Sequence, residues 1–571
     1  MMSGLVGVNR RYTILIAMVV GYYVLGGVPG HSATFHVAQN EPGASDKNNG
    51  LSPIHTSGSH GPWETLHKAA STATASDTVL IYNGDYRQEE HGYGTGIISI
   101  NNSGNSQSAK ITFAAALKQK PVLNTLRIHG QKWIEISGLI FLSPGLTLPD
   151  HWVDMPNIFT HDSTVVIDAD EEWSKREPKI RQKFGTYMSI MDYFDSVYTT
   201  AIDIKNSEHI IVKDNTISLY TFGIQPRDRS KHITIENNDI SRCRNGIYTW
   251  RPQPALSNAH IVNNFLHQNF QNGIDVRENA QDIVIENNRI EYSGMSHITV
   301  INGVQNSIIR GNRVQFGGYY SETMHYPGSS AINVHSSREG IVVEGNVAAY
   351  QIDLTGNDGN GYIADLMLNG AGVVFKNNIA FRNMGAGINT TVSPNSMMVN
   401  NSLIENGYNA KNSRNGAGIK LSREQDQNQT ILNNIFYNNT TAGIKSYKII
   451  LAQKRIDYNL YYAPNGAPFI WDGYQVNDRA YKTIGQIRQG TPWEKNGKMG
   501  DPQFVDLSSQ NFNVKSTSPA IDAGQTLSEV TNDFNRKSRP QKTSYDIGAV
   551  EYEDEHKQPL PSAPRQLRIV Q

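Results

Sequence analysis

A two-residue signature ending in asparagine recurs about every two dozen residues through the middle of the chain. The nine copies are Asp214-Asn215, Asn237-Asn238, Asn263-Asn264, Asn287-Asn288, Gly311-Asn312, Gly345-Asn346, Asn377-Asn378, Asn400-Asn401 and Asn433-Asn434. Their first residues lie 23, 26, 24, 24, 34, 32, 23 and 33 positions apart. The unit is therefore close to 24 residues, with extra length confined to certain units, and a repeat of this size predicts a solenoid.

Each unit contains short segments in which apolar residues alternate with polar ones. Residues 273–277, 282–286 and 289–292 show this pattern and predict three strands. Asparagine tolerates the left-handed backbone region, so a recurring Asn indicates a recurring sharp turn whose amides can stack in a hydrogen-bonded ladder. Three strands and three turns per unit predict an all-β fold, a right-handed parallel β-helix of roughly ten or more coils.

Both ends of the chain predict features outside the repeats. Arg10 and Arg11 precede an apolar run over 13–28 and the small-residue stretch 29–33, which predicts a signal peptide (1–33) cut after Ala33, with an uncleaved anchor as the alternative. Residues 61–70 predict a short amphipathic helix, with Pro62 in its first turn, over the open end of the solenoid. Residues 145–200 interrupt the repeat and are interpreted as an excursion from a β-helix domain spanning 34–499.

The C-terminal part of the chain contains three further segments of interest. They are Gly500-Asp-Pro-Gln-Phe-Val-Asp506, Ser518-Pro-Ala-Ile-Asp-Ala-Gly524 and Asp546-Ile-Gly-Ala-Val-Glu551. Together with the repeats, they resemble the secreted β-helix proteins of the pectate lyase-like superfamily. The resemblance implies a cap over 500–552 that closes the solenoid, followed by a flexible tail over 553–571. It implies a fold rather than a reaction, because this scaffold serves many chemistries.

The composition of the chain limits the classes of molecule that it is expected to bind. The 51 basic and 52 acidic residues nearly cancel, so nothing indicates a nucleic-acid partner. The single cysteine, Cys243, excludes an intramolecular disulfide framework. We expect a monomer that is secreted, periplasmic or displayed at the cell surface, with no membrane contact after signal cleavage.

Aligning the units on one strand reveals two columns of residues that should face outward. The first column is Asp203, Gln225, Tyr248, Asp275, Thr299, Asn333, Ile363, Asn389 and Lys420. The second is Lys205, Arg227, Trp250, Arg277, Ile301, His335, Asp365, Thr391 and Ser422. So many charged and aromatic residues on one strand face predict a polysaccharide groove, of which Asp203 and Lys420 would be solvated ends.

Extra length in the units at 317–329, 351–360 and 408–415 precedes the same strand, and insertions on one face of a repeat array often mark the binding face. The centre of activity is therefore predicted between Trp250 and Asn389. Its predicted substrate-binding residues are Trp250, Arg251, Asp275, Arg227, Asn333 and Asn389.

The reaction we favour is β-elimination on a uronate-containing glycan, which needs a base for the C5 proton and a cation to neutralise the carboxylate. Arg277 with Arg251 would bind the carboxylate, and His335 with Tyr326 would act as base and acid. Asp353, Asp358 and Asp365 are candidate Ca²⁺ ligands, because this ion prefers several carboxylate oxygens. Asp365 would otherwise orient His335. Residues 357–365 are similar to an Asp-Gly turn and strand in calcium-dependent β-helix lyases, although those carry a lysine where this chain has Asp365.

Three alternatives stay open. A glycoside hydrolase would pair Asp365 with Asp353 or Asp358. A uronate C5-epimerase is suggested by residues 223–230, which resemble an alginate epimerase stretch but have Gln225 and Arg227 in place of its first Asp and its His. A non-catalytic glycan-binding or surface protein would bind without cleaving.

Overall fold

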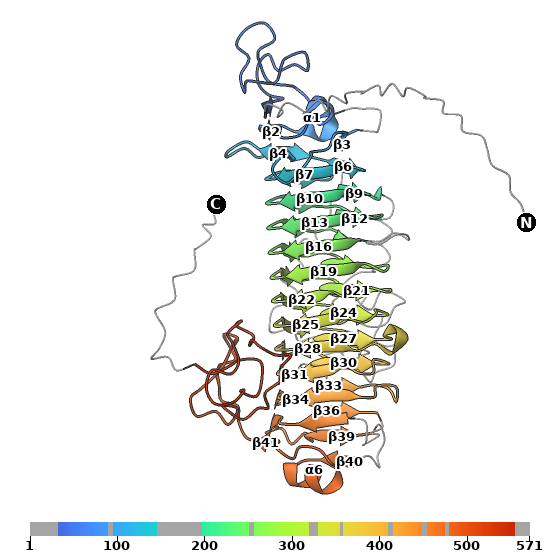
Figure 1. Cartoon of the computed structure of the whole chain (residues 1–571), viewed down its shortest axis with the longest axis vertical. Helices are drawn as coiled ribbons and strands as arrows, with labels where there is room; N and C mark the ends of the chain where they lie inside the picture. The colour runs from blue at the N-terminus through green and yellow to red at the C-terminus, as the bar shows by residue number, and fades with distance from the viewer. Residues whose placement is uncertain are drawn as a thin grey trace, which may run out of the picture.

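The computed structural model describes residues 32–89, 95–144, 194, 197–249, 256–318, 329–353, 358–408, 415–447, 454–473 and 479–553. The chain coils into a long rod built from three parallel sheets, and each coil adds one strand to each sheet (Figure 1). This is the right-handed parallel β-helix that the repeat predicts. Fourteen strands at the usual spacing of about 4.8 Å give a rod about 60 Å long.

We call the sheets the first, second and third sheet. The first consists of β1 (Thr34–Val37), β2 (Thr78–Ile81), β4 (Ile111–Ala115), β7 (Lys132–Ser137), β10 (Glu208–Lys213), β13 (Lys231–Glu236), β16 (Ser257–Val262), β19 (Gln281–Glu286), β22 (Ile308–Arg310), β25 (Ile341–Glu344), β28 (Val373–Lys376), β31 (Met397–Val399), β34 (Gln429–Leu432) and β37 (Lys454–Asp457). The second consists of β5 (Val122–Leu123), β8 (Ile140–Leu142), β11 (Thr216–Ser218), β14 (Asp239–Ser241), β17 (Phe265–His267), β20 (Arg289–Glu291), β23 (Arg313–Gly317), β26 (Val347–Gln351), β29 (Ile379–Phe381), β32 (Ser402–Ile404), β35 (Ile435–Tyr437), β38 (Leu460–Tyr462) and β41 (Lys498–Met499).

The third sheet carries the outward columns. It consists of β3 (Ile97–Ile100), β6 (Thr125–His129), β9 (Thr200–Lys205), β12 (Phe222–Arg227), β15 (Asn245–Tyr248), β18 (Ile274–Val276), β21 (Ile298–Ile301), β24 (Ile332–His335), β27 (Tyr362–Asp365), β30 (Ile388–Thr391), β33 (Ala417–Leu421), β36 (Ala442–Ser446), β39 (Ile470–Asp472) and β40 (Arg479–Tyr481). Alternate residues of its strands, such as Ile332 and Val334, enter the apolar core that runs along the rod.

The asparagine signature forms the corner between the first and second sheets. The first residue of each pair adopts a positive φ, from 52° at Asn400 to 63° at Gly311. The second residue is buried, and its side-chain Nδ2 donates to the Oδ1 of the next coil at 3.0–3.2 Å. The predicted ladder is thus confirmed, and it extends through Asn459 to Glu494.

Short helices lie over the two ends of the solenoid (Figure 1). At the N-terminal end, α1 (Leu66–Thr72) buries Leu66, Ala69 and Ala70. The prediction that it begins around Pro62 is wrong, because the Thr65 side chain accepts from the Lys68 N–H and fixes the first turn there. At the C-terminal end, β40 pairs antiparallel with β39 and leads into α6 (Ile484–Gly490), which stops further stacking.

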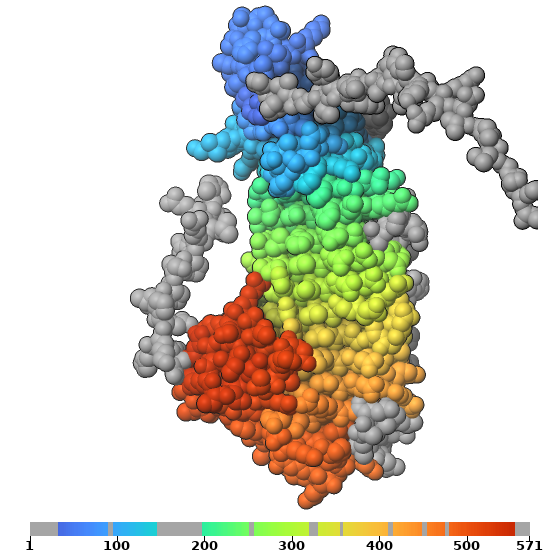
Figure 2. Space-filling model, in the orientation of Figure 1, coloured from blue at the N-terminus to red at the C-terminus, as the bar shows by residue number. Residues whose placement is uncertain are grey.

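The segment 501–553, which includes β42 (Phe504–Asp506) and β43 (Asn511–Val514), lies beside the rod rather than over its end (Figures 1 and 2). Its apolar residues pack against the outer face of the second sheet, where Phe512, Ile547 and Val550 join a cluster with Ile379 and Ile404. The segment that we expected to cap the solenoid therefore packs along its side. The helix α6 covers the C-terminal end instead.

Candidate functional site on the third sheet

The outward columns align along the third sheet as the sequence predicts. Register pairs join Asn333 to Ile363 and Ile363 to Asn389, and they join His335 to Asp365. The columns therefore run along one face of the solenoid, with neighbours about 4.8 Å apart. Trp250, Arg251 and Tyr326 lie outside the described residues.

Much of this face is less exposed than expected. Asp275 is completely buried, and Asn389 is 3% exposed. Asp203 and Lys420, which we expected to be solvated ends, are each only 7% exposed. That expectation is wrong, because each finds polar partners on the same face: His129 and Arg227 bond to Asp203, and Asn415 accepts from Lys420.

His335 and Asp365 occupy adjacent coils and stay accessible. Their Nε2 and Oδ2 atoms are 3.8 Å apart, and the two side chains are 34% and 27% exposed. Burial, reinforced by the negative charge of Asp426, raises the pKa of Asp365, while His335 and Arg423 act in the opposite direction. A histidine beside such a carboxylate is the arrangement in which an imidazole is oriented and exchanges protons.

Near this pair lie two more groups that influence each other's charge, Asp358 just before β27 and Lys420 on β33, with the coil of β30 between them. Burial and the nearby Asp353 raise the pKa of Asp358 to about 7, against the opposing effect of Lys420. Burial likewise lowers the pKa of Lys420, although Asp358 raises it. Strongly perturbed groups cluster at functional sites, so this stretch of the third sheet is the best candidate centre.

The three candidate calcium ligands divide between two places. Asp353 is buried and accepts from the Asp358 N–H at 2.7 Å, whereas Asp365 faces His335. Within the described ranges, no group of three or more His, Cys, Asp or Glu side chains could hold a metal ion. The carboxylates of Asp353 and Asp358 could together bind one cation. The third predicted ligand, Asp365, does not lie with them.

Arg277, predicted to bind the uronate carboxylate, and Arg227, predicted to bind the substrate, already have carboxylate partners. Arg277 donates from Nε and Nη2 to Asp275 at 2.6 and 2.7 Å, and it lies 5.5 Å from the centre of the Tyr248 ring. Arg227 holds Asp203 in the same two-pronged manner at 2.9 Å. Arg227 also donates its Nη1 to Asp228.

Arg127 was missed by sequence reasoning. It sits one coil before Asp203 in the first column, so extending the alignment into β6 would have found it. It lines a cavity of about 240 Å³ with Tyr198, Gln225 and Asp203. No carboxylate pairs with Arg127 in the described part of the chain, Tyr198 is 47% exposed, and the buried Gln225 Nε2 has no hydrogen-bond partner. A free cation, an exposed ring and an unused amide suit an acidic sugar.

The two predicted asparagine contacts differ. Asn389 Oδ1 accepts from Ser422 Oγ at 2.7 Å, so one acceptor is already committed. Among the described residues, the buried Asn333 Oδ1 has no hydrogen-bond partner, and neither has the hydroxyl of Thr299 beside it in the column. Asn333 is thus the better candidate for a substrate contact, because a buried acceptor without a partner carries an energetic cost.

The stacked coils, the asparagine ladder and the polar outward face together define a right-handed parallel β-helix protein. A family model described as "Periplasmic copper-binding protein (NosD)" matches residues 159–315. The chain is similar to the solved structure of pectate lyase Pel9A, with 14% identity and a TM-score of 0.40, covering 91% of this chain and 98% of that one.

Two further structures show comparable likeness. A GH136 lacto-N-biosidase from Eubacterium ramulus has 11% identity and a TM-score of 0.38, covering 82% of this chain and 67% of that one. A rhamnogalacturonan lyase has 12% identity and a TM-score of 0.33, covering 87% and 97%. No curated protein matches the chain.

Proposed function

We propose that this protein is a secreted or periplasmic enzyme that binds an acidic polysaccharide along the third sheet and cleaves it by β-elimination. The observation that carries the proposal is the accessible His335–Asp365 pair, which lies near two groups with shifted pKa values, Asp358 and Lys420. The described residues contain no helix long and apolar enough to cross a membrane.

In the proposed reaction, His335 removes the proton at C5 of a uronate. The electrons of that C–H bond form the C4=C5 double bond, and the C4–O4 bond breaks. The leaving oxygen takes a proton from an acid, for which Tyr326 is our candidate. Asp365 orients the imidazole and stabilises its charged form.

Carboxylates of the glycan would meet Arg277 near the centre and Arg127 at the N-terminal end of the same face. Arg127 on β6 is six strand spacings from His335 on β24, which is about 29 Å along the rod. Arg127 would therefore act on a distant sugar of the same chain and contribute binding rather than chemistry.

A hydrolase is the second candidate, because two carboxyl groups of the centre, Asp358 and Asp365, have raised pKa values. A carboxyl that titrates near neutral pH can act as a general acid while a second one assists. Ca²⁺ at Asp353 and Asp358 remains a separate proposal, in which the ion would neutralise these carboxylates and the substrate.

One experiment separates these reactions. The purified protein is incubated with acidic and neutral polysaccharides, with and without a chelator, while ultraviolet absorbance of the new double bond and reducing ends are recorded. A lyase raises both signals, a hydrolase raises only reducing ends, and a binder raises neither. If Ca²⁺ is needed, the chelator abolishes activity and added Ca²⁺ restores it.

Variants then locate the centre. His335→Ala and Asp365→Ala should each lower turnover about 100-fold or more, because each removes a proton-transfer group or its orienting partner. His260→Ala and Asp282→Ala are matched controls on exposed positions of the first sheet and should retain activity. Arg127→Ala should raise KM for long chains with little change for short ones. Full activity in both centre variants would place the reaction elsewhere.

A further inference from the structure

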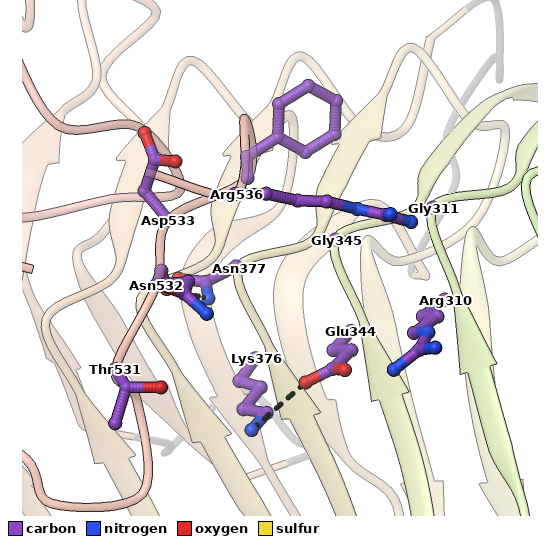
Figure 3. Close-up of a pocket in the computed structure, with 11 residues that line it drawn as sticks. Arg310, Gly311, Glu344, Gly345, Lys376, Asn377, Thr531, Asn532, Asp533 and Arg536 are labelled. Atoms are coloured by element: carbon purple, nitrogen blue, oxygen red, sulfur yellow. Dashed lines mark hydrogen bonds and ion pairs between the residues drawn. The ribbon is translucent and has the colours of Figure 1, made fainter. Parts of the chain in front are cut away.

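A loop of the C-terminal segment, residues 531–536, arches over the corner between the first and second sheets (Figure 3). At one end of this arch, Arg536 Nη2 donates to Glu286 Oε1 and Asn287 Oδ1, both at 2.7 Å. At the other end, Asn377 Nδ2 donates to the Asn532 carbonyl at 2.6 Å. The two coils between these contacts pass beneath the arch.

Those two coils are the ones that carry glycine in the asparagine signature. Gly311 and Gly345 occupy the positive-φ position that Asp or Asn fills in the other seven copies. The backbone does not require glycine here, because Asn377 adopts a φ of 56° beside φ values of 63° and 61° at the glycines. What glycine supplies is the absence of a side chain.

That absence leaves a cavity of about 220 Å³ under the arch. A Cβ at Gly345 would find its nearest neighbour, the Phe534 carbonyl oxygen, 3.9 Å away, so a side chain there would project into open space. At Gly311 a Cβ would lie only 2.4 Å from Asn287 Oδ1. Position 345 is therefore the one at which the cavity can be filled without displacing its walls.

One wall of the cavity alternates in charge. Arg310, Glu344 and Lys376 end three neighbouring strands of the first sheet and are register partners. Lys376 Nζ lies 3.0 Å from Glu344, and Arg310 Nη2 lies 2.7 Å from Glu286. The Nε of Arg310 is buried and has no hydrogen-bond partner within the described ranges.

The opposite wall comes from the arch. Thr531 and Asn532 lie on this side (Figure 3), and the Phe534 carbonyl oxygen is the atom nearest to Gly345. The cavity thus offers cationic donors, carboxylate and carbonyl acceptors, and an amide. A hydroxyl group both donates and accepts hydrogen bonds, so a molecule rich in hydroxyls satisfies mixed walls without introducing a new charge.

We propose that this cavity is a second carbohydrate-binding site, one that holds a single sugar residue under the arch. Its volume is below the roughly 300 Å³ at which pockets for drug-sized ligands begin, which suits one ring. The site lies at the corner of the first and second sheets, away from the outward face of the third, so it does not depend on the proposed reaction. It would hold a glycan without cleaving it.

The test uses saturation-transfer NMR on the intact protein with glucose, galactose, xylose, rhamnose, galacturonate and glucuronate as probes. At least one should bind the wild type. Gly345→Asn introduces the residue that the fold uses at this turn in other coils and should weaken that binding at least tenfold. Gly466→Asn is the matched control, because Gly466 also has a positive φ and no atom within 4 Å of an added Cβ.

A second variant guards against a folding defect in the first. Arg310→Lys keeps a positive charge beside Glu286 but removes the unpartnered Nε, and it too should weaken binding. The proposal is overturned if none of the six sugars binds, or if Gly345→Asn and Arg310→Lys both bind like the wild type. It is also overturned if Arg127→Ala alone removes the signal, which would put the sugar on the third sheet.

Discussion

At the scale of single residues, several buried charges of the described residues are compensated by an adjacent opposite charge, as Asp275 is by Arg277. Glu494 is different. It is fully buried and receives hydrogen bonds from Tyr461 Oη and Asn459 Nδ2, both at 2.7 Å, and no cation pairs with it in the described part of the chain. Burial raises the pKa of Glu494 to about 7 from 4.5, although these hydrogen bonds act in the opposite direction.

This shift predicts a pH dependence of stability. The folded state binds the proton more tightly than the unfolded state, so the contribution is fully present below pH 4.5 and is lost as pH rises to about 7. The loss amounts to at most about 3 kcal/mol. Denaturant unfolding of the wild type and Glu494→Gln at several pH values measures it, and the variant should have the flatter profile. Equal slopes would show that Glu494 titrates normally.

Residue roles were predictable where they depend on repeat position and not where they depend on a partner from elsewhere. The adjacency of His335 and Asp365 follows from counting residues within the units, and the register confirms it. The pairing of Arg277 with Asp275 could have been suspected from their spacing, because alternate residues of a strand face the same side. The burial of Lys420 could not, since it accompanies a side-chain contact with Asn415, which lies before the strand and has no place in the columns.

At the scale of elements, the asparagine ladder is the feature that spans the most coils. Asn264 illustrates how each ladder residue is bonded. Its Nδ2 donates to Asn288 Oδ1 and to the carbonyl oxygens of Ile235 and Val262, and its Oδ1 accepts from Asn238. All of these atoms are removed from water, so each depends on the next coil for its partner.

We therefore expect Asn264→Ala to lower the free energy of unfolding by about 1–3 kcal/mol, because it leaves buried donors and a buried carbonyl without partners. The neighbouring Asn263→Gly is the control. It changes the turn residue to the glycine found at positions 311 and 345, and should cost much less. Thermal melting of both variants provides the comparison, and equal losses would mean that the turn rather than the ladder matters.

The repeat made this element predictable, whereas the helix at the N-terminal end was predicted four residues too early. Apolar spacing and Pro62 favoured an early start. Local capping decided the outcome, since Thr65 satisfies the free N–H of Lys68 and Glu89, from a later coil, accepts from the N–H of Leu66. A cap supplied from 23 residues away is not visible in the local pattern.

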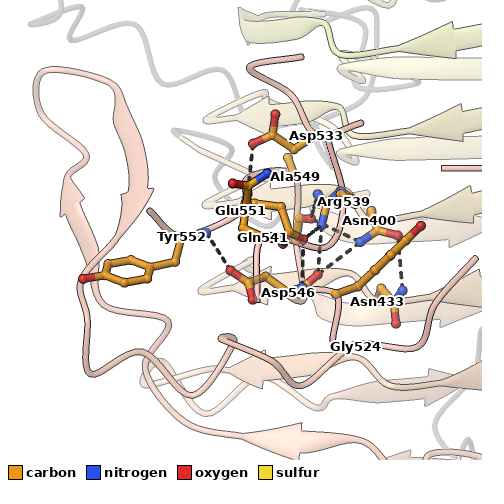
Figure 4. A network of polar contacts seen from close by, with 12 residues as sticks. Asn400, Asn433, Gly524, Asp533, Arg539, Gln541, Asp546, Ala549, Glu551 and Tyr552 are labelled. Carbon is orange, nitrogen blue, oxygen red and sulfur yellow. Dashed lines mark hydrogen bonds and ion pairs between the residues drawn. The ribbon is translucent and has the colours of Figure 1, made fainter. Parts of the chain in front are cut away.

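At the scale of the whole molecule, the C-terminal segment is held to the rod by a buried polar network around Arg539 (Figure 4). Its guanidinium bonds to Glu551, to the Gly548 carbonyl at 2.8 Å and to Asn377 Oδ1 at 3.2 Å. Asn400 and Asn433 of the ladder corner bond to the same segment through Asp546 and Gln525.

Arg539→Ala should release this segment, because it leaves the Glu551 carboxylate buried without its cation, a loss of about 3–5 kcal/mol. Hydrogen exchange should then increase over 501–553 while the central coils stay protected. Arg455→Ala removes an exposed contact to Gln525 and should change little. Uniform protection across the Arg539 variant would show that apolar packing alone holds the segment.

The contact between Arg536 and Glu286 joins positions 250 residues apart. Coils can stack in order as the chain leaves the ribosome or crosses a membrane, but this contact must wait until the last part of the protein has emerged. Until then, the second-sheet flank that includes Ile379, Ile404 and Ile435 has no cover. Folding therefore ends when the C-terminal segment docks onto the rod. A chain whose synthesis stops before residue 500 exposes an apolar strip that chaperones and proteases can recognise as unfolded.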